Sequence, residues 1–344
     1  MHVLVVNDDG PPCRKLSPYV RPFVDALQDA GHRVSVAVPA ASRSWIGKAH
    51  IIGASLTATY VHPDSFREDG TWEEEEEEEC RAVSGNLPPT PAASSEHLNP
   101  TTITSPSTTN SNLAPATTKE QERWVVVSNG TPASCAQLGI YELFRDRGEI
   151  DLIVSGPNHG RNASTIYNLS SGTVGGALEA ATCGKRGIAL SFGSKEEQQP
   201  EVIQAAARLS ARLIDHLYRN WDERVELYNL NVPMRADVES RPVRYTRALP
   251  NVWTKGSLYA EIHHPSLVNG TSQVVGTTPK PSTQPRRVRQ FQWSTELSDI
   301  KRSLAESAAG TDARTVLDGF TSVTPLLANF WHPPGFDGEL QLGS

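Results

Sequence analysis

Short runs of apolar residues alternate with amphipathic stretches over most of the chain. The first run, Val3–Val6, precedes a helical stripe and then a second apolar run at residues 33–38. A strand, a helix and a strand of these lengths form a right-handed βαβ unit, which implies a parallel sheet. The alternation continues through apolar runs at residues 124–127, 150–154, 187–192 and 225–232. The pattern therefore predicts an α/β fold, a parallel sheet sandwiched by helices.

Helix-start signals support this interpretation at three places, Ser17-Pro18, Thr131-Pro132 and Ser171-Gly172. Serine or threonine at the N-cap can accept a hydrogen bond from a free backbone N–H group, and proline is favoured at the first helical position. Pro22 falls inside the first stripe, which favours a regular helix that begins one turn later.

Two polar segments interrupt the alternation. Residues 65–121 hold the glutamate run Glu73–Glu79 and then a tract rich in Ser, Thr, Pro and Asn. Such a composition cannot bury enough apolar surface to offset the entropy of ordering, so we expect a disordered insertion. The glutamate run could hold calcium or a partner, but a solvated loop that repels itself is the commoner outcome.

Beyond residue 240 the pattern changes to short alternating segments, at residues 243–245, 258–262 and 316–326. They predict a β-rich C-terminal extension with a flexible loop at 266–287. The expected organisation is a single domain. Its catalytic core comprises residues 1–64 and 122–240, the insertion spans 65–121, and the C-terminal oligomerisation segment spans 241–344.

Composition excludes several classes of function. The formal net charge is −7, and much of it comes from the glutamate run, so there is no basic footprint for duplex nucleic acid. No apolar run approaches the ~18 residues needed to span a bilayer, and no cleavable apolar segment precedes the first strand. The four cysteines lack CxxC spacing, which fits a reducing compartment and no zinc site. We therefore expect a cytoplasmic protein that binds neither duplex nucleic acid nor a membrane.

Two adjacent carboxylates, Asp8 and Asp9, follow the first strand directly, before the turn residues Gly10–Pro12. Ligands of open α/β sheets bind outside the carboxyl ends of the strands. Adjacent buried carboxylates repel each other unless a cation neutralises them, and carboxylate oxygens suit Mg²⁺, Mn²⁺ or Ca²⁺. The alternative is an Asx-type turn in which Asp9 caps a helix.

Two further segments carry candidate binding residues, and neither segment alone is strong evidence for a site. The loop after the second strand offers the Ser44 hydroxyl and the Lys48 ammonium, although polar loops of this kind are more often surface turns. The helix start at Ser171–Thr173 offers free N–H groups and hydroxyls to an anion. The alternative there is an ordinary N-cap, and it explains the small residues at 175–177 better than a phosphate does.

Taken together, ordered motifs along nearly the whole chain outside the two polar insertions resemble the SurE (survival protein E) family of metal-dependent nucleotide phosphatases. In chain order they are Asn7–Gly10; Arg43-Ser44 with Gly47; Gly130–Ala133 with Cys135; Ser155-Gly156 with Asn158, Gly160 and Asn162; Ser171–Val174 with Gly176-Ala177 and Glu179; Asn229–Pro233; and Val323–Leu326. Each motif is weak, but the ordered set is specific. The Ser44–Ala49 variant and the insertion resemble the eukaryotic, fungal-type branch.

The resemblance implies a Rossmann-like core and a metal-dependent phosphomonoesterase that hydrolyses nucleoside 5′- or 3′-monophosphates, other phosphoesters or short polyphosphate. It implies a homodimer and a divalent metal, Mg²⁺ or Mn²⁺, held by Asp8, Asp9, Ser44 and Asn158. The metal would polarise the phosphoryl oxygens and activate a water molecule, and either aspartate would orient that water or accept its proton. The expected phosphate-binding residues are Asn162, Ser171, Gly172, Thr173 and Lys48.

Some residues depart from the family pattern. Pro11–Cys13 replace a glycine and apolar residues, Ser164 replaces a glycine, and His159 is extra. His159 could protonate the leaving alcohol, but packing in the loop or exposure to solvent is the commoner role of a lone loop histidine. Two rivals remain. A haloacid-dehalogenase-type phosphatase would have its acids one residue apart rather than adjacent, and a non-catalytic nucleotide-binding scaffold would not need the intact set of oxygen ligands.

Overall fold

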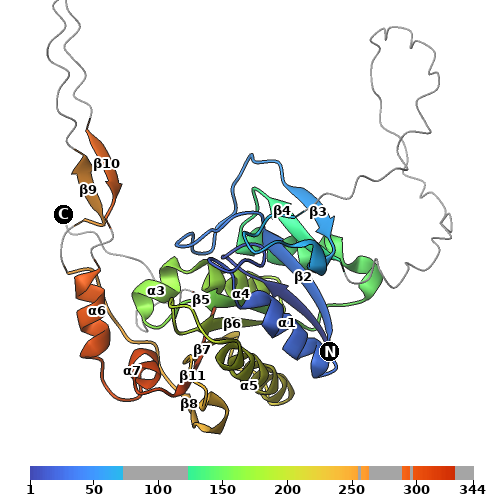
Figure 1. Ribbon diagram of the computed structural model, residues 1–344. Coiled ribbons are helices and arrows are strands. Elements are labelled where there is room, and N and C mark those ends of the chain that lie inside the picture. The colour runs from blue at the N-terminus through green and yellow to red at the C-terminus, as the bar shows by residue number, and fades with distance from the viewer. Residues whose placement is uncertain (73–122, 255–256, 263–288, 295–296, 330–344) are drawn as a thin grey trace, which may run out of the picture.

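A computed structural model describes residues 1–72, 123–254, 257–262, 289–294 and 297–329 (Figure 1). The strands are β1 (His2–Val6), β2 (Arg33–Pro39), β3 (Thr57–Val61), β4 (Trp124–Ser128), β5 (Leu152–His159), β6 (Arg186–Phe192), β7 (Leu227–Val232), β8 (Val243–Tyr245), β9 (Tyr259–Ile262), β10 (Gln290–Trp293) and β11 (Thr321–Leu326). The helices are α1 (Val20–Asp29), α2 (Pro132–Leu138), α3 (Thr165–Ser170), α4 (Gly172–Thr182), α5 (Pro200–Arg219), α6 (Ser298–Ala305) and α7 (Asp312–Leu317).

A nine-stranded sheet in the order β3-β4-β2-β1-β5-β6-β7-β11-β8 forms the centre of the molecule. The strands from β4 to β7 in this order run parallel, as the alternating pattern predicts. Strand β3 pairs antiparallel with β4, and β11 pairs antiparallel with β7 and parallel with β8. Strands β9 and β10 form a separate antiparallel arm (Figure 1).

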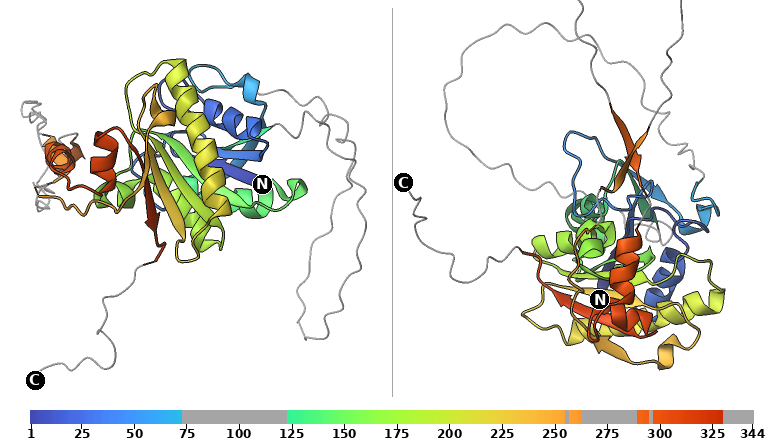
Figure 2. Two further views of the ribbon diagram at one scale, coloured as in Figure 1. Left: turned by 90° about the horizontal axis from the view of Figure 1, so that it is seen from below. Right: turned by 90° about the vertical axis from the view of Figure 1, so that its left-hand side faces the viewer.

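Helices cover both faces of the sheet. Helices α1 and α5 pack together on one face, and α2 and α4 pack together on the other (Figure 2). Strand β1 shows why, because Val3 and Val5 belong to the cluster beneath α1 and α5, whereas Leu4 and Val6 belong to the cluster beneath α2. Alternate residues of a strand point to opposite faces, so a continuous apolar run supplies both cores. The α/β sandwich predicted from the sequence is confirmed.

Several element boundaries differ from the sequence-based expectation. The first helix begins at Val20 with Tyr19 at its N-cap, two residues later than the predicted cap Ser17, and Pro22 lies in its first turn. Helix α2 starts as expected, with a reciprocal capping box between Thr131 and Ser134.

The C-terminal segment contains the predicted strands but also two helices that the pattern did not indicate. The expected strand at 316–326 is wrong over its first five residues, because β11 begins only at Thr321. Val316 and Leu317 end α7, which starts where the Thr311 hydroxyl accepts a hydrogen bond from the Arg314 N–H group.

Part of the predicted insertion lies within the described residues. Phe66 and Trp72 form an isolated β-bridge, and the Phe66 ring packs between the rings of Trp72 and Trp124. Residues 65–72 are therefore tied to the core. The remainder of the predicted insertion, including the glutamate run, lies outside the described residues, as does the predicted loop at 266–287. In the part of the chain that the structure describes, no helix is both long and apolar enough to cross a membrane.

Candidate functional site

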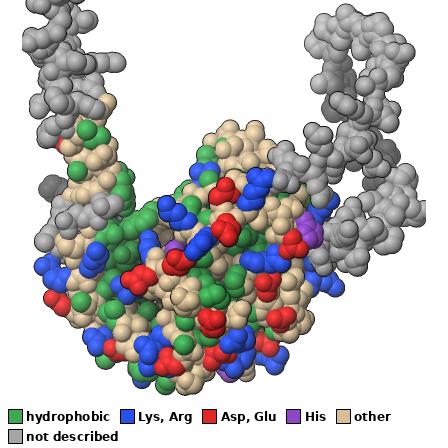
Figure 3. Space-filling model, viewed as in Figure 1, with side chains coloured by type: hydrophobic (Ala, Val, Ile, Leu, Met, Phe, Trp, Pro, Cys, Tyr) green, Lys and Arg blue, Asp and Glu red, His purple; other side chains and the backbone are tan. Residues whose placement is uncertain are grey.

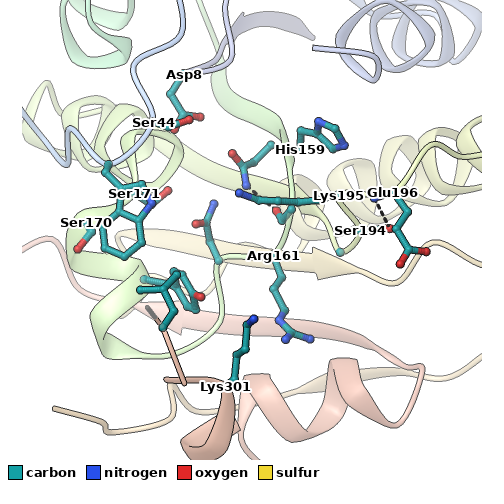
Figure 4. A pocket seen from close by; sticks show the side chains of 17 residues that line it. Asp8, Ser44, His159, Arg161, Ser170, Ser171, Ser194, Lys195, Glu196 and Lys301 are labelled. Atoms are coloured by element: carbon teal, nitrogen blue, oxygen red, sulfur yellow. Dashed lines mark hydrogen bonds between the residues drawn. The ribbon is translucent and has the colours of Figure 1, made fainter. Parts of the chain in front are cut away.

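A cavity of about 620 Å³ opens at the carboxyl ends of the central strands (Figure 4). Its walls come from the end of β1, the loop after β2, the end of β5, the α3–α4 junction, the loop after β6 and helix α6. This is the edge of a parallel sheet where ligands bind. Asp8, Ser44, Asn158, Asn162 and Ser171, all predicted site residues, line it together.

The turn after β1 is built by Asn7. Its amide nitrogen donates to the Gly10 carbonyl (2.8 Å), and its amide oxygen accepts from the Gly10 N–H group (3.1 Å). Gly10 adopts φ +94°, a conformation that costs glycine little. The Asx-turn alternative is wrong in giving this role to Asp9, which caps no helix because α1 starts only at Val20. Both carboxylates are thereby left for another purpose.

Asp8 lies against the N-terminus of α4. Its carboxylate accepts a 2.5 Å hydrogen bond from the Thr173 hydroxyl, and the backbone N–H groups of Gly172 and Thr173 favour its charged form more weakly. A side chain at position 172 would clash, because a Cβ atom there would lie 2.7 Å from the Asp8 Cβ. Burial raises the pKa of Asp8, although these hydrogen bonds oppose the shift. The anion that the helix start holds in the structure is thus the Asp8 carboxylate.

Asp9 is also buried and has fewer donors. The His159 N–H group donates to its Oδ2 atom at 2.7 Å. Burial, and next the charge of Asp8, raise the pKa of Asp9 well above its ordinary value, against the weaker influence of Lys195. Among the described residues neither aspartate forms an ion pair. Two adjacent buried carboxylates with so little compensation create a place where a cation would be stabilised.

Ser44 and Asn158 supply neutral oxygens to the same cavity. The loop that carries Ser44 is tied to β1 by a 2.7 Å hydrogen bond from the Arg43 N–H group to the Asp8 carbonyl. The side-chain nitrogen of Asn158 donates to the Gly160 carbonyl at 2.5 Å, which leaves the amide oxygen available as an acceptor. A register shift in β5 between Ser155 and Asn158 accompanies this placement. Figure 4 shows Asp8 and Ser44 together at one end of the cavity.

The donor set fits a hard divalent cation, since two carboxylates, a hydroxyl and an amide are all oxygen donors. Within the described residues no group of three or more His, Cys, Asp or Glu side chains could hold a metal by itself. A cation at this place would therefore depend on Ser44 and Asn158 as well as on the aspartates.

The predicted phosphate-binding residues at the α4 start have partners inside the protein. The Ser171 hydroxyl accepts from the Val174 N–H group (3.1 Å), and the Thr173 hydroxyl donates to Asp8. A Cβ atom at Gly176 would lie 2.5 Å from the Ser155 hydroxyl, so glycine there permits close packing of helix on sheet. The N-cap alternative therefore accounts for these residues in the structure.

Lys48 lies away from the cavity. Its ammonium group contacts the buried Glu179 carboxylate at 2.6 Å, and His50 contacts the same carboxylate at 3.3 Å. Asn162, in contrast, lines the cavity, where its amide donates to the Ser191 hydroxyl (2.9 Å) and its N–H group donates to Asn231 (2.8 Å).

His159 packs edge-on against Tyr19, with ring centroids 5.2 Å apart. Burial, and next the charge of Lys195, lower the pKa of its imidazole. A half-buried neutral ring agrees with the packing role.

Three cations that sequence reasoning missed also line the cavity, Arg161, Lys195 and Lys301. None of them is ion-paired with any described residue, and Figure 4 shows Arg161 and Lys301 facing the cavity at the end away from Asp8. Lys195 follows β6, so the strand-end rule could have found it, and Arg161 adjoins the predicted Asn162. Lys301 gave no such signal, because it belongs to α6.

Comparisons with known proteins agree on one family. The model of the family described as "Survival protein SurE" matches residues 3–255. A "5′-nucleotidase SurE" of Nitratidesulfovibrio vulgaris is 27% identical over 333 residues, covering 96% of this chain and 94% of the relative. A "Probable tubulin--tyrosine ligase PBY1" of Saccharomyces cerevisiae is 31% identical over 356 residues, covering 99% of this chain. The chain spans only 43% of that yeast protein's length.

A solved structure shows the same fold. The SurE protein from Aquifex aeolicus superposes with a TM-score of 0.56 at 20% identity, covering 96% of this chain and 95% of the other. At this identity the likeness concerns the fold alone.

Proposed function

The chain belongs to the SurE family, and from this premise we propose that it is a metal-dependent phosphomonoesterase that hydrolyses nucleoside 5′- or 3′-monophosphates. The observation that carries the proposal is the polarity of one cavity. The buried Asp8 carboxylate lines one end, with the buried Asp9 next to it in the chain, and Arg161, Lys195 and Lys301, which form no ion pair with any described residue, line the rest. An anionic substrate that also needs a cation at its reacting group matches both features.

A divalent cation held by Asp8, Asp9, Ser44 and Asn158 would neutralise the aspartates, polarise the phosphoryl oxygens and lower the pKa of a water molecule. The chain itself supplies orientation. Thr173 and the α4 N-terminus hold the Asp8 carboxylate, and the His159 N–H group holds that of Asp9. Lys195 and Arg161 would attract the phosphate by charge, and Asn162 would add a polar contact from a side chain fixed by β6.

The proton acceptor in this scheme is one of the two aspartates. Asp9 is the better candidate, because the Thr173 hydroxyl at the start of α4 holds the Asp8 carboxylate, while Asp9 has only a backbone donor among the described residues. Burial, and next the charge of Asp8, raise the pKa of Asp9, and a carboxylate with a raised pKa is a more effective general base than an ordinary one.

Phosphate release tests the proposal directly. The protein is incubated with p-nitrophenyl phosphate and a panel of nucleotides, with Mg²⁺, with Mn²⁺ or with EDTA. We expect activity with metal and none with EDTA. For Asp9→Asn we expect kcat to fall by more than about 100-fold. Loss of a residue that only hydrogen-bonds to a metal ligand usually lowers activity by about 10–100-fold, and loss of the ligand itself should lower it further. Asp318→Asn, a substitution of a partly exposed carboxylate, is the matched control.

Activity that ignores EDTA or survives Asp9→Asn would refute the metal mechanism. Binding of nucleotides without hydrolysis under every metal condition would instead support the non-catalytic scaffold. The name of the yeast relative belongs to a protein of which this chain covers less than half, and the cavity residues described above give no separate support for a ligase.

A further inference from the structure

A cluster of aromatic rings surrounds Trp45, next to the metal-ligand candidate Ser44. The Trp45 ring contacts Trp293 (centroids 5.1 Å apart), Tyr167 (5.9 Å) and Trp253 (6.3 Å). The four residues come from the loop after β2, helix α3, the loop after β8 and strand β10. Segments far apart in the sequence thus bring indole and phenol rings to one place.

The backbone holds Trp45 in an unusual conformation. Its φ angle is +65°, in the left-handed region that bulky residues rarely adopt because it strains the backbone. Neighbouring bonds impose this geometry, since the Ile46 N–H group donates to the Arg43 carbonyl and the Gly47 N–H group to the Ser170 carbonyl (2.9 Å). Backbone strain of this kind is found mainly at functional sites, so we expect the Trp45 side chain to contribute to function.

The rings belong to the cavity that holds the candidate metal site. Trp45 and Tyr167 line it together with Asp8, Ser44 and Arg161. Trp253 and Trp293 pack on Trp45 from the arm side and keep 41% and 39% of their surface exposed. In Figure 3 hydrophobic side chains gather where the β9–β10 arm meets the body. One cavity therefore offers carboxylates, cations and flat aromatic surface.

We propose that Trp45 and Tyr167 form a stacking site for the base of a nucleotide, with Trp253 and Trp293 supporting the Trp45 ring. The site selects nucleoside monophosphates over phosphomonoesters that lack a base, and purines over pyrimidines. This inference rests on the proposed phosphomonoesterase function and adds the residues that determine its substrate preference. Aromatic side chains stack on every base because each has a π-face, and a larger base covers more ring surface.

Paired substrates test the inference. Values of kcat/KM are measured for adenosine 5′-monophosphate and for ribose 5-phosphate, which carry the same phosphate and sugar with and without a base. For Trp45→Ala we expect a loss of about tenfold with the nucleotide, equivalent to ~1.4 kcal/mol. With ribose 5-phosphate we expect a change below about twofold, because no stacking is lost. Tyr167→Leu should show the same asymmetry.

Two further variants separate stacking from mere support of the loop. Trp45→Phe keeps an aromatic face and should recover most of the preference for the nucleotide. Phe291→Ala removes an exposed ring from the same strand as Trp293, outside the Trp45 cluster, and should leave the ratio of the two substrates unchanged. An equal loss with both substrates in Trp45→Ala would overturn the inference, since the ring would then only hold the Ser44 loop.

Binding gives a readout that does not need hydrolysis. In EDTA, adenosine 5′-monophosphate should quench tryptophan fluorescence, ribose 5-phosphate should not, and the quenching should fall in Trp45→Phe. If the protein hydrolyses neither substrate but the base-dependent quenching is present, the proposed function fails and the stacking site stands. If both substrates are hydrolysed at equal efficiency and neither quenches, the stacking site fails and the proposed function stands.

Discussion

Asp312 and the Asp8–Asp9 pair are all buried, but they differ in the hydrogen-bond donors and charges that surround them. Asp312 accepts three backbone hydrogen bonds, from the N–H groups of Ser164 (2.9 Å), Leu249 (2.9 Å) and Ala313 (2.7 Å). Asp9 accepts one bond from a backbone N–H group, and the charge that influences it most is that of another carboxylate, Asp8.

The difference separates a structural acid from a candidate functional one. Asp312 joins the α3 start, the loop after β8 and helix α7, and its negative charge is met by donors from all three. Burial of the Asp8–Asp9 pair destabilises the fold, because the hydrogen bonds that the two carboxylates accept do not fully compensate for their loss of solvation. We expect such a destabilising pair at a site where a bound ligand, here a cation, neutralises its charge.

The largest expected effect concerns stability at Asp312. Asp312→Ala leaves three buried N–H groups without an acceptor, so the free energy of unfolding should fall by about 3 kcal/mol or more. Urea unfolding measures the loss, and Asp318→Asn, which removes a partly exposed i,i+4 ion pair, should change it by less than about 0.5 kcal/mol. If Asp312→Ala lowers the unfolding free energy no more than Asp318→Asn does, Asp312 is not the structural acid that distinguishes it from the Asp8–Asp9 pair.

Metal binding should stabilise the protein by the next largest amount. Mn²⁺ or Mg²⁺ at 100 times its dissociation constant should add about 2.7 kcal/mol, or roughly 5–10 °C in the thermal midpoint. The increase should be absent in Asp9→Asn and preserved in Asp318→Asn. An unchanged midpoint in the wild-type protein at saturating metal would contradict a cation site at Asp8 and Asp9.

Glu179 is an intermediate case, because its buried carboxylate is balanced by Lys48 rather than by backbone donors. Lys48→Met should cost about 1–2 kcal/mol of unfolding free energy, since it leaves the buried carboxylate with the weaker partners His50, Gln137 and Cys183. The double variant Lys48→Met/Glu179→Gln should recover much of that loss. A rise in KM without any loss of stability would instead support the predicted contact of Lys48 with phosphate.

The smallest effect has the opposite sign. Without metal, Asp9→Asn removes one charge from a repelling buried pair and keeps an oxygen that can accept the His159 N–H bond. The unfolding free energy in EDTA should therefore rise by about 1 kcal/mol. Scanning calorimetry of the two proteins in EDTA measures the difference, and a destabilised variant would show that Asp9 is a structural acid like Asp312.

The parts of the molecule that could be predicted from sequence are those set by local periodicity and chain order. The apolar run Val3–Val6 predicts a buried strand, and strand polarity then brings Asp8, Ser44 and Asn158 to one edge of the sheet. The capping box at Thr131 is likewise a local feature.

Partners between distant segments could not be predicted in this way. Nothing near Thr173 in the sequence indicates that its hydroxyl bonds Asp8, or that Lys48 is bound by Glu179. The short helices α6 and α7 also escaped prediction, because their few turns are stabilised by burial of Ile300, Leu304 and Ala313 against α3 residues. Lys301 enters the cavity only through that packing.

The edge-on and tilted packing of the Trp72, Phe66 and Trp124 rings affects how long a connection the fold can accept between Trp72 and Trp124. These contacts hold Trp72 and Trp124, which flank residues 73–122, close together beside the sheet edge formed by β3 and β4. Because the entropy of closing a loop grows only with the logarithm of its length, each doubling between such fixed ends costs about 0.6 kcal/mol. The fold can therefore accept a long or a short connection between Trp72 and Trp124 at nearly the same stability.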